Sequence, residues 1–329
     1  MGHPQTGPQA LQFSLKMGSN QGVVIRSTGS WCTILSEDGK ITECKLKGNF
    51  RIKGIRSTNP VAVGDKVGFS FQKDKEYGLI HEIFPRSNYI IRKATRLSAQ
   101  SHIIAANIDQ AIVMVTLSRQ RTSPVFIARF LVTAEAYHIP AFLIFNKCDQ
   151  YSADENRQLD DLISLYESLG YPCFRTSALM HEGIEAVNLL LRGKVSLVSG
   201  HSGVGKTALI NAIEPGSMRK VGDISDYHLK GKHTTTFAEM ILLSNGGFVI
   251  DTPGIKEFGL VDFDKQEVAE RFPEMRELMH NCQFSNCTHV HEPGCAVKSA
   301  LSEGKLSKSR YANYISILGD EYFEETDWD

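Results

Sequence analysis

The chain has 329 residues, of which 42% are hydrophobic and 22% are charged, with 27 glycines and 11 prolines. This composition is typical of a folded globular protein and excludes disordered, collagen-like and coiled-coil chains, while the length favours two or three domains. The formal net charge of −1 conceals an uneven distribution of charge along the chain. The final segment DEYFEETDWD is strongly acidic, and the rest of the chain is net basic. No apolar run reaches the ~18 residues that a membrane span needs, so we expect a cytoplasmic protein without a membrane partner.

The N-terminal third predicts a small β-barrel. Residues 1–20 lack periodicity and are expected to form a flexible tail. Residues 21–95 contain short β-rich runs separated by turn signals such as Glu37-Asp38-Gly39; the runs are GVVIRS, WCTILS, ITECKLK, VGFSFQ and GLIHEIF. Five short strands in so short a segment favour an oligonucleotide-binding (OB-type) barrel, which we expect to bind RNA.

Two basic stretches lie in and after this barrel. Residues 38–56 hold six lysines and arginines against two acids, and residues 86–96 contain four basic side chains and no acid: Arg86, Arg92, Lys93 and Arg96. Such local excess suits a polyanion, although a solvated surface is the alternative. The side chains expected to contact phosphates are Lys45, Lys47, Arg51, Lys53 and Arg56.

Residues 96–264 alternate between apolar strands and amphipathic helices. We expect strands at 110–117, 141–145, 172–176 and 194–199, helices at 124–138, 154–169 and 182–192, and two further strands at 237–243 and 247–251. Buried strands that alternate with helices predict a parallel sheet covered on both faces. Ligands of such sheets bind at the carboxyl ends of the strands.

A phosphate-binding loop is predicted at residues 200–207. The sequence GHSGVGKT matches GxxxxGK[ST] between the strand KVSLVS and the helix TALINAI. In this pattern backbone N–H groups surround a phosphate, the lysine reaches the β- and γ-phosphates, and the threonine is a Mg²⁺ ligand, whereas the alternative is a glycine-rich turn. The nucleotide-binding residues expected here are Gly200, Ser202, Gly203, Val204, Gly205, Lys206, Thr207 and Ala208.

Guanine specificity is predicted at residues 146–149, with the sequence NKCD directly after the strand AFLIF. A carboxylate at Asp149 can accept hydrogen bonds from N1–H and the N2 amine of guanine, a donor pair that adenine lacks. Asn146 and Lys147 belong to the same pattern. Ser177 and Ala178, after the next strand, fit a backbone contact to guanine O6.

The remaining GTPase elements surround the magnesium ion. Asp251, in the sequence DTPG after the strand GGFVI, is expected to hold Mg²⁺ through water, and the Gly254 amide to contact the γ-phosphate. The switch GKHTTT at 231–236 supplies a second hydroxyl ligand, assigned to Thr235 although its neighbouring threonines remain alternatives. Ile255 occupies the position of the water-positioning glutamine of Ras-like enzymes, so His233 is the candidate for that task beside the catalytic Lys206, with His228 as its rival.

The order of the motifs indicates a circular permutation. An ordinary GTPase runs from P-loop to switch, DxxG, NKxD and SA, whereas this chain begins with NKCD and SA and ends with DTPG. The C-terminal domain is therefore attached directly after the switch region. This attachment gives the nucleotide state a mechanical route to that domain.

A zinc site is predicted in the C-terminal helical domain, residues 265–319, which precedes the acidic tail 320–329. The cluster Cys282-x₄-Cys287-x-His289-x₅-Cys295 offers three thiols and one imidazole. Four protein ligands form a closed, structural Zn²⁺ site without room for a catalytic water. His280 and His291 are weaker candidates for the fourth ligand, and unligated cysteines are the alternative.

The permuted order, GHSGVGKT, GKHTTT, DTPGI, the barrel and the cysteine cluster together resemble the bacterial ribosome small-subunit-dependent GTPase A family. The resemblance implies a Mg²⁺-dependent GTP hydrolase that acts as a late assembly and maturation factor of the small (30S) ribosomal subunit. It also implies stimulation by that subunit, rRNA contacts through the barrel and the zinc domain, and GTP or GDP as bound nucleotide. We expect a monomer.

Two other functions compete with this interpretation. The chain could be a nucleotide-gated RNA-binding module in which hydrolysis is incidental. A metabolic P-loop kinase is disfavoured, because NKCD and DTPG would then have no task.

Overall fold

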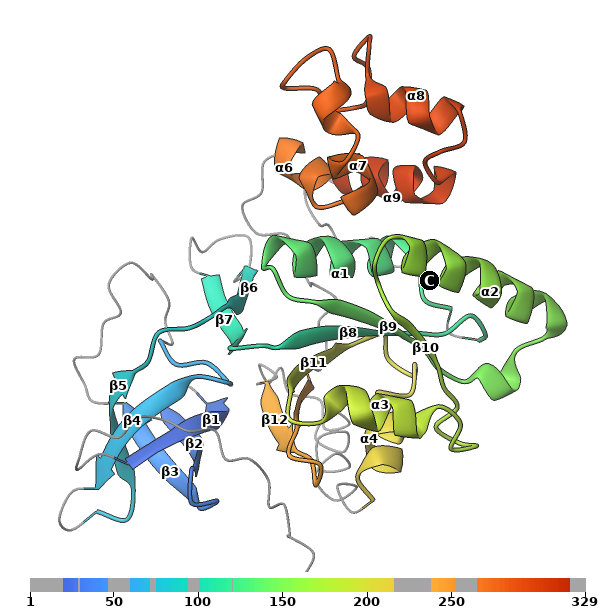
Figure 1. The fold of residues 1–329 in the computed structure, drawn as a ribbon. Coiled ribbons are helices and arrows are strands. Elements are labelled where there is room, and N and C mark those ends of the chain that lie inside the picture. The colour runs from blue at the N-terminus through green and yellow to red at the C-terminus, as the bar shows by residue number, and fades with distance from the viewer. Residues whose placement is uncertain are drawn as a thin grey trace, which may run out of the picture. The chain divides into compact units, whose positions relative to one another are not determined.

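The structure is a computed structural model that describes residues 20–28, 30–46, 60–71, 75–93, 101–119, 121–215, 238–251 and 265–319 (Figure 1). By compactness the chain divides into two units. The first comprises Met1–Ile108, Leu191–Ser196 and Thr234–Pro253, and the second comprises Asp109–Leu190, Leu197–His233 and Gly254–Asp329. Among the described residues, no helix is both long and apolar enough to cross a membrane.

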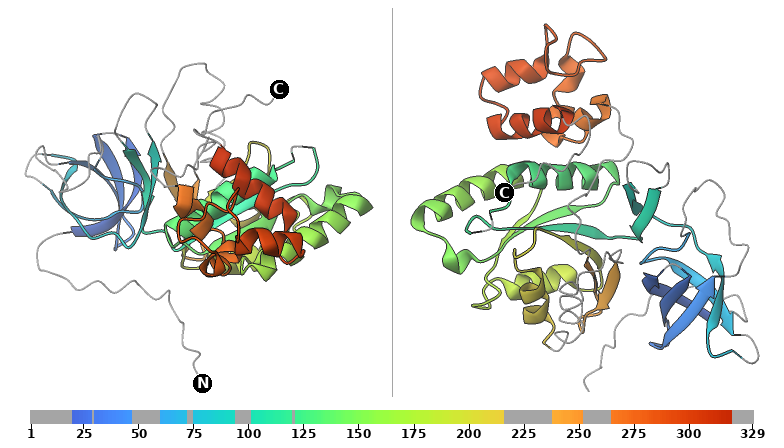
Figure 2. Two further views of the ribbon diagram at one scale, coloured as in Figure 1. Left: turned by 90° about the horizontal axis from the view of Figure 1, so that it is seen from above. Right: turned by 180° about the vertical axis from the view of Figure 1, so that it is seen from behind.

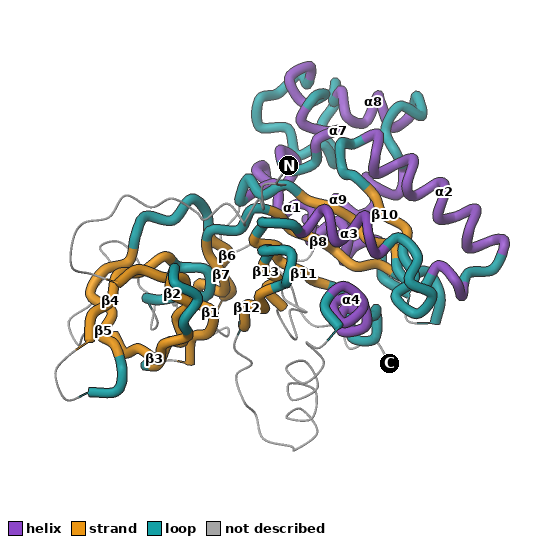
Figure 3. The backbone as a smooth tube through the Cα atoms, turned by 60° about the horizontal axis from the view of Figure 1, so that its bottom comes forward, coloured by secondary structure: helices purple, strands orange, loops and turns teal. Residues whose placement is uncertain are grey.

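The first unit contains the predicted barrel. Its strands are β1 (Asn20–Thr28), β2 (Trp31–Ser36), β3 (Ile41–Leu46), β4 (Lys66–Phe71) and β5 (Gly78–Ile83). They follow the order β1-β2-β3-β5-β4, and β4 pairs again with β1, which closes the ring seen in Figure 3. All neighbours are antiparallel except β3 and β5, which are parallel. The predicted five-stranded OB-type barrel is therefore confirmed.

Alternate side chains of the strands point into the barrel and fill its interior. The buried side chains come from every strand and share one core, formed by Val24, Cys32, Ile34, Cys44, Val61, Val67, Phe69 and Ile80. Successive side chains of a strand point to opposite faces, so the residues between these positions face outward. Apolar burial inside the closed ring stabilises it. The pairing of β4 with β1 protects the strand edges that an open sheet would expose.

The basic stretch after the barrel is not a linker. It forms an antiparallel ribbon of β6 (Tyr89–Lys93) and β7 (Ser101–Ala106). Asn88, just before β6, is bonded to Ile108, just after β7. The Asn88 side-chain amide donates to the Ile108 carbonyl oxygen, and Asn88 Oδ1 accepts from the Ile108 N–H, both at 2.8 Å. These strands are not predicted from the sequence, because the basic residues between the apolar runs resemble a polar connection.

Arg86 is also not part of an exposed basic surface. Its Nε donates to Asp65 Oδ1 at 2.6 Å, and its Nη2 donates to Asp65 Oδ2 at 2.7 Å and to the Pro60 carbonyl oxygen at 2.8 Å. The Asp65 side chain is fully buried and that of Arg86 is 8% exposed. Arg86 therefore adds no free positive charge to the basic stretch at 86–96, because its charge is already paired with Asp65.

The strands predicted at 237–243 and 247–251 are confirmed as β12 (Glu239–Leu242) and β13 (Phe248–Asp251). They are antiparallel, with Glu239 opposite Asp251. β12 also pairs with β1, where Glu239 lies opposite Arg26, so this hairpin continues the strands of the barrel.

The second unit contains β8, β9, β10 and the part of β11 from Leu197 onward, which are neighbours in the order β10-β9-β8-β11. These strands are β8 (Gln110–Val115), β9 (Ala141–Phe145), β10 (Cys173–Arg175) and β11 (Val195–Ser199), and β8, β9 and β10 are parallel. Figure 1 shows α1 (Pro124–Ala136) and α2 (Ala153–Ser168) on one face and α3 (Ile184–Leu191) and α4 (Lys206–Ile213) on the other. The expected parallel sheet with helices on both faces is confirmed.

Local sequence explains where the long helices begin. Ser123 caps α1 by accepting the Phe126 N–H, and Pro124 occupies the first helical position, where its missing N–H costs nothing. At α2, Ser152 and Glu155 form a reciprocal capping box. These caps fix where both helices begin, and α1 packs against β8 and β9 whereas α2 packs against β10.

The C-terminal segment contains α6 (Lys265–Glu270), α7 (Pro273–Arg276), a 3-10 turn (Met279–Asn281), α8 (Ala296–Ser302) and α9 (Lys308–Gly319), grouped together in Figure 2. Their apolar side chains share a core with Ala128 and Val132 of α1. Two of the predicted metal ligands, Cys287 and Cys295, belong to the same core. The metal cluster and α1 are therefore parts of one packed structure.

Candidate functional site

The predicted P-loop connects β11 to α4. Gly205, directly before α4, has φ +102°, and a Cβ there would lie 2.3 Å from Asn146 Nδ2. A Cβ at Gly200, where φ is +155°, would lie 2.9 Å from the Met114 carbonyl oxygen. Both positions require glycine, the first because another loop crosses it and the second because β8 approaches it.

The first turn of α4 presents the polar residues of the loop. Lys206 Nζ donates to the Gly200 carbonyl oxygen at 2.5 Å and to that of His201 at 3.3 Å, so the ammonium group folds back over the loop. Ser202, Gly203, Thr207 and Ala208 are exposed, whereas Val204 is buried. Free N–H groups at a helix N-terminus attract anions, so this arrangement can receive a phosphate chain.

Asn146 ties three loops together. Its Nδ2 donates to the Val204 carbonyl oxygen of the P-loop at 2.9 Å. Its Oδ1 accepts from Thr176 Oγ1 at 3.1 Å and from the Ala178 N–H at 3.3 Å. The side chain is only 1% exposed, so all of these bonds are shielded from water.

Asp149 faces the neighbouring loop from the same segment. Asp149 lies in the 3-10 turn Cys148–Gln150, and its Oδ1 accepts a hydrogen bond from Ser177 Oγ at 2.6 Å. Lys147 before this turn has φ +64°, and its Cε lies 3.9 Å from the position of a Cβ on Gly205, so its stem runs along the P-loop. The structure thus brings together the predicted guanine residues Asn146, Lys147, Asp149, Ser177 and Ala178.

Two residues that hold this segment were missed in the sequence. Tyr151 donates its hydroxyl hydrogen to the Asn146 carbonyl oxygen at 2.8 Å and accepts the Leu117 N–H at 3.0 Å. The Thr176 carbonyl oxygen accepts the Cys148 N–H at 3.1 Å. For Thr176, its position directly before Ser177-Ala178 was the one signal in the sequence. For Tyr151 there was no local signal, because its contact with Leu117 depends on the tertiary structure.

A ring contact supports the P-loop from α1. The imidazole of His201 lies against the Phe126 ring, with centroids 4.1 Å apart and planes inclined by 35°. Phe126 is in the first turn of α1, and Ala128 and Val132 of the same helix pack against the C-terminal helices. One helix therefore contacts both the P-loop and the domain that holds the cysteine cluster.

Several predicted residues fall outside the described part of the chain. Among the nucleotide-site residues these are the switch residues His233 and Thr235, the rival His228, and Gly254. Four of the predicted phosphate contacts also lie outside the described residues: Lys47, Arg51, Lys53 and Arg56. Asp251 is described, and it ends β13 as a half-buried residue.

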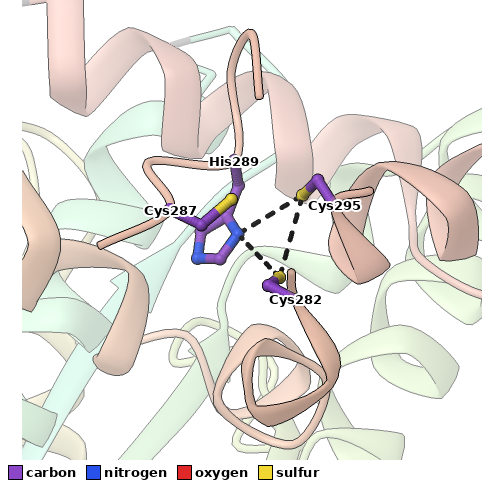
Figure 4. Close-up of side chains that lie close together, drawn as sticks. All are labelled: Cys282, Cys287, His289 and Cys295. Atoms are coloured by element: carbon purple, nitrogen blue, oxygen red, sulfur yellow. Dashed lines mark hydrogen bonds between the residues drawn. The ribbon is translucent and has the colours of Figure 1, made fainter. Parts of the chain in front are cut away.

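The four predicted metal ligands form a cluster (Figure 4). The ligand atoms of Cys282, Cys287, His289 and Cys295 all lie within 4.8 Å of one another. His289 Nδ1 is 3.6 Å from Cys282 Sγ and 3.4 Å from Cys295 Sγ, and these two sulfurs are 4.0 Å apart. A tetrahedral zinc ion, with Zn–S of about 2.3 Å and Zn–N of about 2.0 Å, sets S···S near 3.8 Å and S···N near 3.5 Å. The spacing of these three ligand atoms therefore fits one such ion, and Cys287 Sγ lies within 4.8 Å of all of them.

Burial shifts the pKa values of two of the metal-binding side chains, and only the shift of His289 favours metal binding. Burial lowers the pKa of His289, which favours the neutral imidazole that binds metals. It raises the pKa of the Cys287 thiol to about 12, and the nearby thiols of Cys295 and Cys282 act in the same direction. A divalent cation would reverse this preference by stabilising the thiolates. Cys295 Sγ also accepts the Lys298 N–H at 3.5 Å at the start of α8, where a negative charge is favoured.

The loop that carries His289 is fixed by hydrogen bonds. Glu292 Oε1 accepts from Thr288 N at 2.9 Å and Thr288 Oγ1 at 2.6 Å, and these bonds lower the pKa of the Glu292 carboxyl group. The hydroxyl of Tyr311 donates to the His289 carbonyl oxygen at 2.8 Å, and that of Tyr314 to the Thr288 carbonyl oxygen at 2.6 Å. Neither His280 nor His291 belongs to the cluster of metal-binding side chains found in the described residues.

Comparison with protein families gives matches to two models. The RsgA GTPase model matches residues 83–261, and the RsgA N-terminal domain model matches residues 21–80. These ranges cover the barrel and all of the predicted nucleotide-binding motifs.

Similar proteins match over most of their length. The "Small ribosomal subunit biogenesis GTPase RsgA 2" of Bacteroides thetaiotaomicron is 52% identical over 92% of this chain and 97% of its own. The "Small ribosomal subunit biogenesis GTPase RsgA" of Phocaeicola vulgatus is 54% identical over the same shares, 92% and 97%.

Solved structures agree with this. YjeQ from Thermotoga maritima is 33% identical, with a TM-score of 0.73 over 91% of this chain and 97% of that one. YloQ, titled a circularly permuted GTPase, is 28% identical, with a TM-score of 0.70 over 92% and 95%. The permuted motif order, the barrel and these matches together place the chain in the RsgA GTPase family, whose members hydrolyse GTP.

Proposed function

We propose that this chain hydrolyses GTP on the small ribosomal subunit and acts there as a late assembly and maturation factor. The relatives named for small ribosomal subunit biogenesis support the subunit as partner. The observation that carries the proposal is that Asn146 joins the guanine loop, the Ser177-Ala178 loop and the P-loop by hydrogen bonds.

The guanine end of the nucleotide is assigned to Asp149. Its carboxylate accepts the N1–H and N2 donors of the base, and Ser177 Oγ at 2.6 Å holds that carboxylate in place. Lys147 lies along the P-loop and can cover the base and ribose. Asp149 is exposed in the structure, so a bound base would cover its carboxylate. Adenine lacks the donor pair and would cover the carboxylate without pairing it, which penalises adenine.

The phosphate end is assigned to the P-loop and Lys206. The residues proposed to hold Mg²⁺ are Thr207 and Thr235 directly and Asp251 through water, with Gly254 contacting the γ-phosphate. When bound, Mg²⁺ neutralises charge that develops on the phosphate oxygens during transfer.

Slow basal hydrolysis is expected from the sequence around DTPG. Ile255 cannot orient a water molecule, and His233 in the switch is the proposed group for that task. Docking on the subunit would place His233 beside the attacking water, so hydrolysis reports correct docking.

The cysteine cluster is proposed to hold one structural zinc ion through Cys282, Cys287, His289 and Cys295. The ligand spacing and the shared core with α1 support this assignment. Zinc there would keep the C-terminal helices folded and able to contact rRNA together with the barrel.

Co-sedimentation tests the proposed partner. Full-length chain should pellet with purified small subunits in the presence of a non-hydrolysable GTP analogue and much less with GDP. Lys206→Ala, which removes the phosphate-binding ammonium group, should abolish the difference between the nucleotides. Equal pelleting of the parent with both nucleotides, or with large subunits, would contradict the proposal.

A further inference from the structure

The outer surface of the barrel carries an aromatic pair with two lysines against it. Trp31 and Tyr77 meet edge to face, with ring centroids 5.3 Å apart. Lys45 Nζ lies 4.2 Å from the Trp31 ring centroid and 4.8 Å from that of Tyr77. Lys75 Nζ lies 5.5 Å from the Tyr77 ring centroid. The pair and the two lysines form what we call the barrel aromatic cluster.

The strand register places this cluster outside the barrel core. Trp31 begins β2, and Lys45 lies directly opposite it on β3. The next pair in register, Cys32 and Cys44, is fully buried inside the barrel. Because side chains alternate along a strand, Trp31 and Lys45 point away from the core.

The cluster occupies the ligand-binding region of this barrel type. OB folds bind oligonucleotides on the face of their second and third strands and on the connections β1–β2 and β4–β5. Trp31 directly follows the β1–β2 connection, and Tyr77 and Lys75 lie in the β4–β5 connection just before Gly78, the first residue of β5.

Packing inside the barrel does not explain the exposed Trp31 ring or the half-buried Tyr77 ring. Trp31 is 37% exposed, and neither Trp31 nor Tyr77 belongs to the barrel core. Phe71, at the end of β4 opposite Gly78, is a further aromatic residue left 53% exposed. Large aromatic surfaces kept in water beside cations fit a polyanion that also offers flat apolar faces.

We propose that the barrel aromatic cluster is a stacking site for an unpaired nucleobase of single-stranded RNA. Trp31 and Tyr77 supply the stacking surface, and Lys45 and Lys75 neutralise the phosphates on either side. The site tolerates any base, because every base has a π-face, but it rejects a duplex, in which both faces of each base are already stacked. The inference rests on the proposed function, because it takes the RNA of the small ribosomal subunit as the partner of the barrel.

A spectroscopic experiment reports on the site directly. The chain has two tryptophans, so Trp328→Phe in the full-length protein leaves Trp31 as the single fluorescent reporter. Decauridylate and decaadenylate should both quench Trp31 fluorescence, whereas a ten-base-pair RNA duplex should leave it nearly unchanged.

The affinity for RNA and its dependence on salt distinguish the contribution of base stacking from that of charge. Trp31→Ala should weaken decauridylate binding by about 5- to 100-fold without changing the log–log salt slope, and Trp31→Phe should retain most of the affinity. Lys45→Ala and Lys75→Ala should each flatten that slope by about 0.7. Ile41→Ala removes another apolar side chain of β3, one that is 62% exposed, and should leave both quantities unchanged.

Unquenched Trp31 fluorescence, or parent-like RNA affinity of Trp31→Ala, would overturn the inference. If Trp31→Ala lost affinity for the small subunit but not for the oligonucleotides, the rings would face a protein and the inference would also be wrong. Stimulation of GTP turnover by small subunits is measured in parallel on the parent chain. Stimulation that persists while the RNA results fail refutes only the stacking site, whereas absent stimulation refutes the proposed function.

Discussion

Asn146 Nδ2 donates a hydrogen bond of 2.9 Å to the carbonyl oxygen of Val204, 58 residues further along the chain. This bond joins the guanine loop to the P-loop, and both partners are buried. In an ordinary GTPase the guanine loop follows the P-loop, but here it precedes it. The contact depends only on the two loops lying at the same edge of the sheet, so the permutation leaves it intact.

Asn146→Ala should therefore damage both ends of the nucleotide site. It leaves the Val204 carbonyl oxygen and the Ala178 N–H without their partner, at about 1 to 3 kcal/mol for each buried group. We expect a 10- to 1,000-fold rise in the Kd for a fluorescent GTP analogue, which corresponds to about 1.4 to 4 kcal/mol.

Asn156→Ala provides the matched control. The Asn156 amide donates to the Tyr151 and Ser152 carbonyl oxygens at the start of α2 and reaches neither nucleotide loop. Its GTP affinity should remain close to that of the parent. Parent-like affinity of Asn146→Ala would show that the three loops keep their positions without it.

Asp149→Asn should change the base preference from guanine towards xanthine. The C2 carbonyl of xanthine replaces the amine of guanine and requires a donor, which the asparagine amide supplies. The measurement is competition between GTP and XTP for the labelled nucleotide. Retained selectivity for GTP would remove Asp149 from the guanine site.

The metal site should be structural, because four protein ligands leave no open position. Cys287→Ser should release zinc and loosen the C-terminal helices that share its core, with little loss of GTP affinity. Zinc content by mass spectrometry and helix content by circular dichroism measure the two effects. His291→Ala, an exposed neighbour outside the cluster, should keep one zinc ion per chain. Stoichiometric zinc in Cys287→Ser would refute the ligand set.

A buried ion pair should govern the stability of the C-terminal helices. Arg310 Nε donates to Glu274 Oε1 at 2.6 Å, and the side chain of Arg310 is 1% exposed. Its guanidinium also lies 4.6 Å from the Phe272 ring centroid. Glu274→Gln leaves this cation without a counter-charge and should lower the free energy of unfolding by about 3 to 5 kcal/mol.

Urea denaturation followed by circular dichroism measures this loss. Arg276→Ala is the control, since its pair with Glu135 is 46% and 24% exposed and should be worth about 1 kcal/mol or less. If Glu274→Gln and Arg276→Ala were equally destabilised, burial of Arg310 would not matter for stability.

The sequence predicted the elements whose local patterns are strong. The strand at 141–145 and both long helices were placed within two residues, because capping residues and apolar periodicity mark them. The ligand set Cys282, Cys287, His289 and Cys295 followed from local spacing alone, and these four side chains lie together in the structure.

Features that depend on distant contacts could not be predicted. Arg86 resembled part of a basic surface, but its buried partner Asp65 is 21 residues away. The support from Tyr151 and the pairing of β12 with β1 depend on the register between separate segments. The barrel aromatic cluster likewise joins residues of β2, β3 and the β4–β5 connection, which no local pattern relates.

GTP turnover in the presence of purified ribosomal particles shows directly whether the small subunit stimulates this GTPase. Small subunits, large subunits and whole ribosomes are added separately to the full-length chain, with Lys206→Ala as the inactive control. We expect slow turnover of the chain alone, stimulation by small subunits of about 100-fold or more if docking positions His233, and little stimulation by large subunits. Turnover that is the same with all three particles as without them would show that the small subunit does not activate this GTPase.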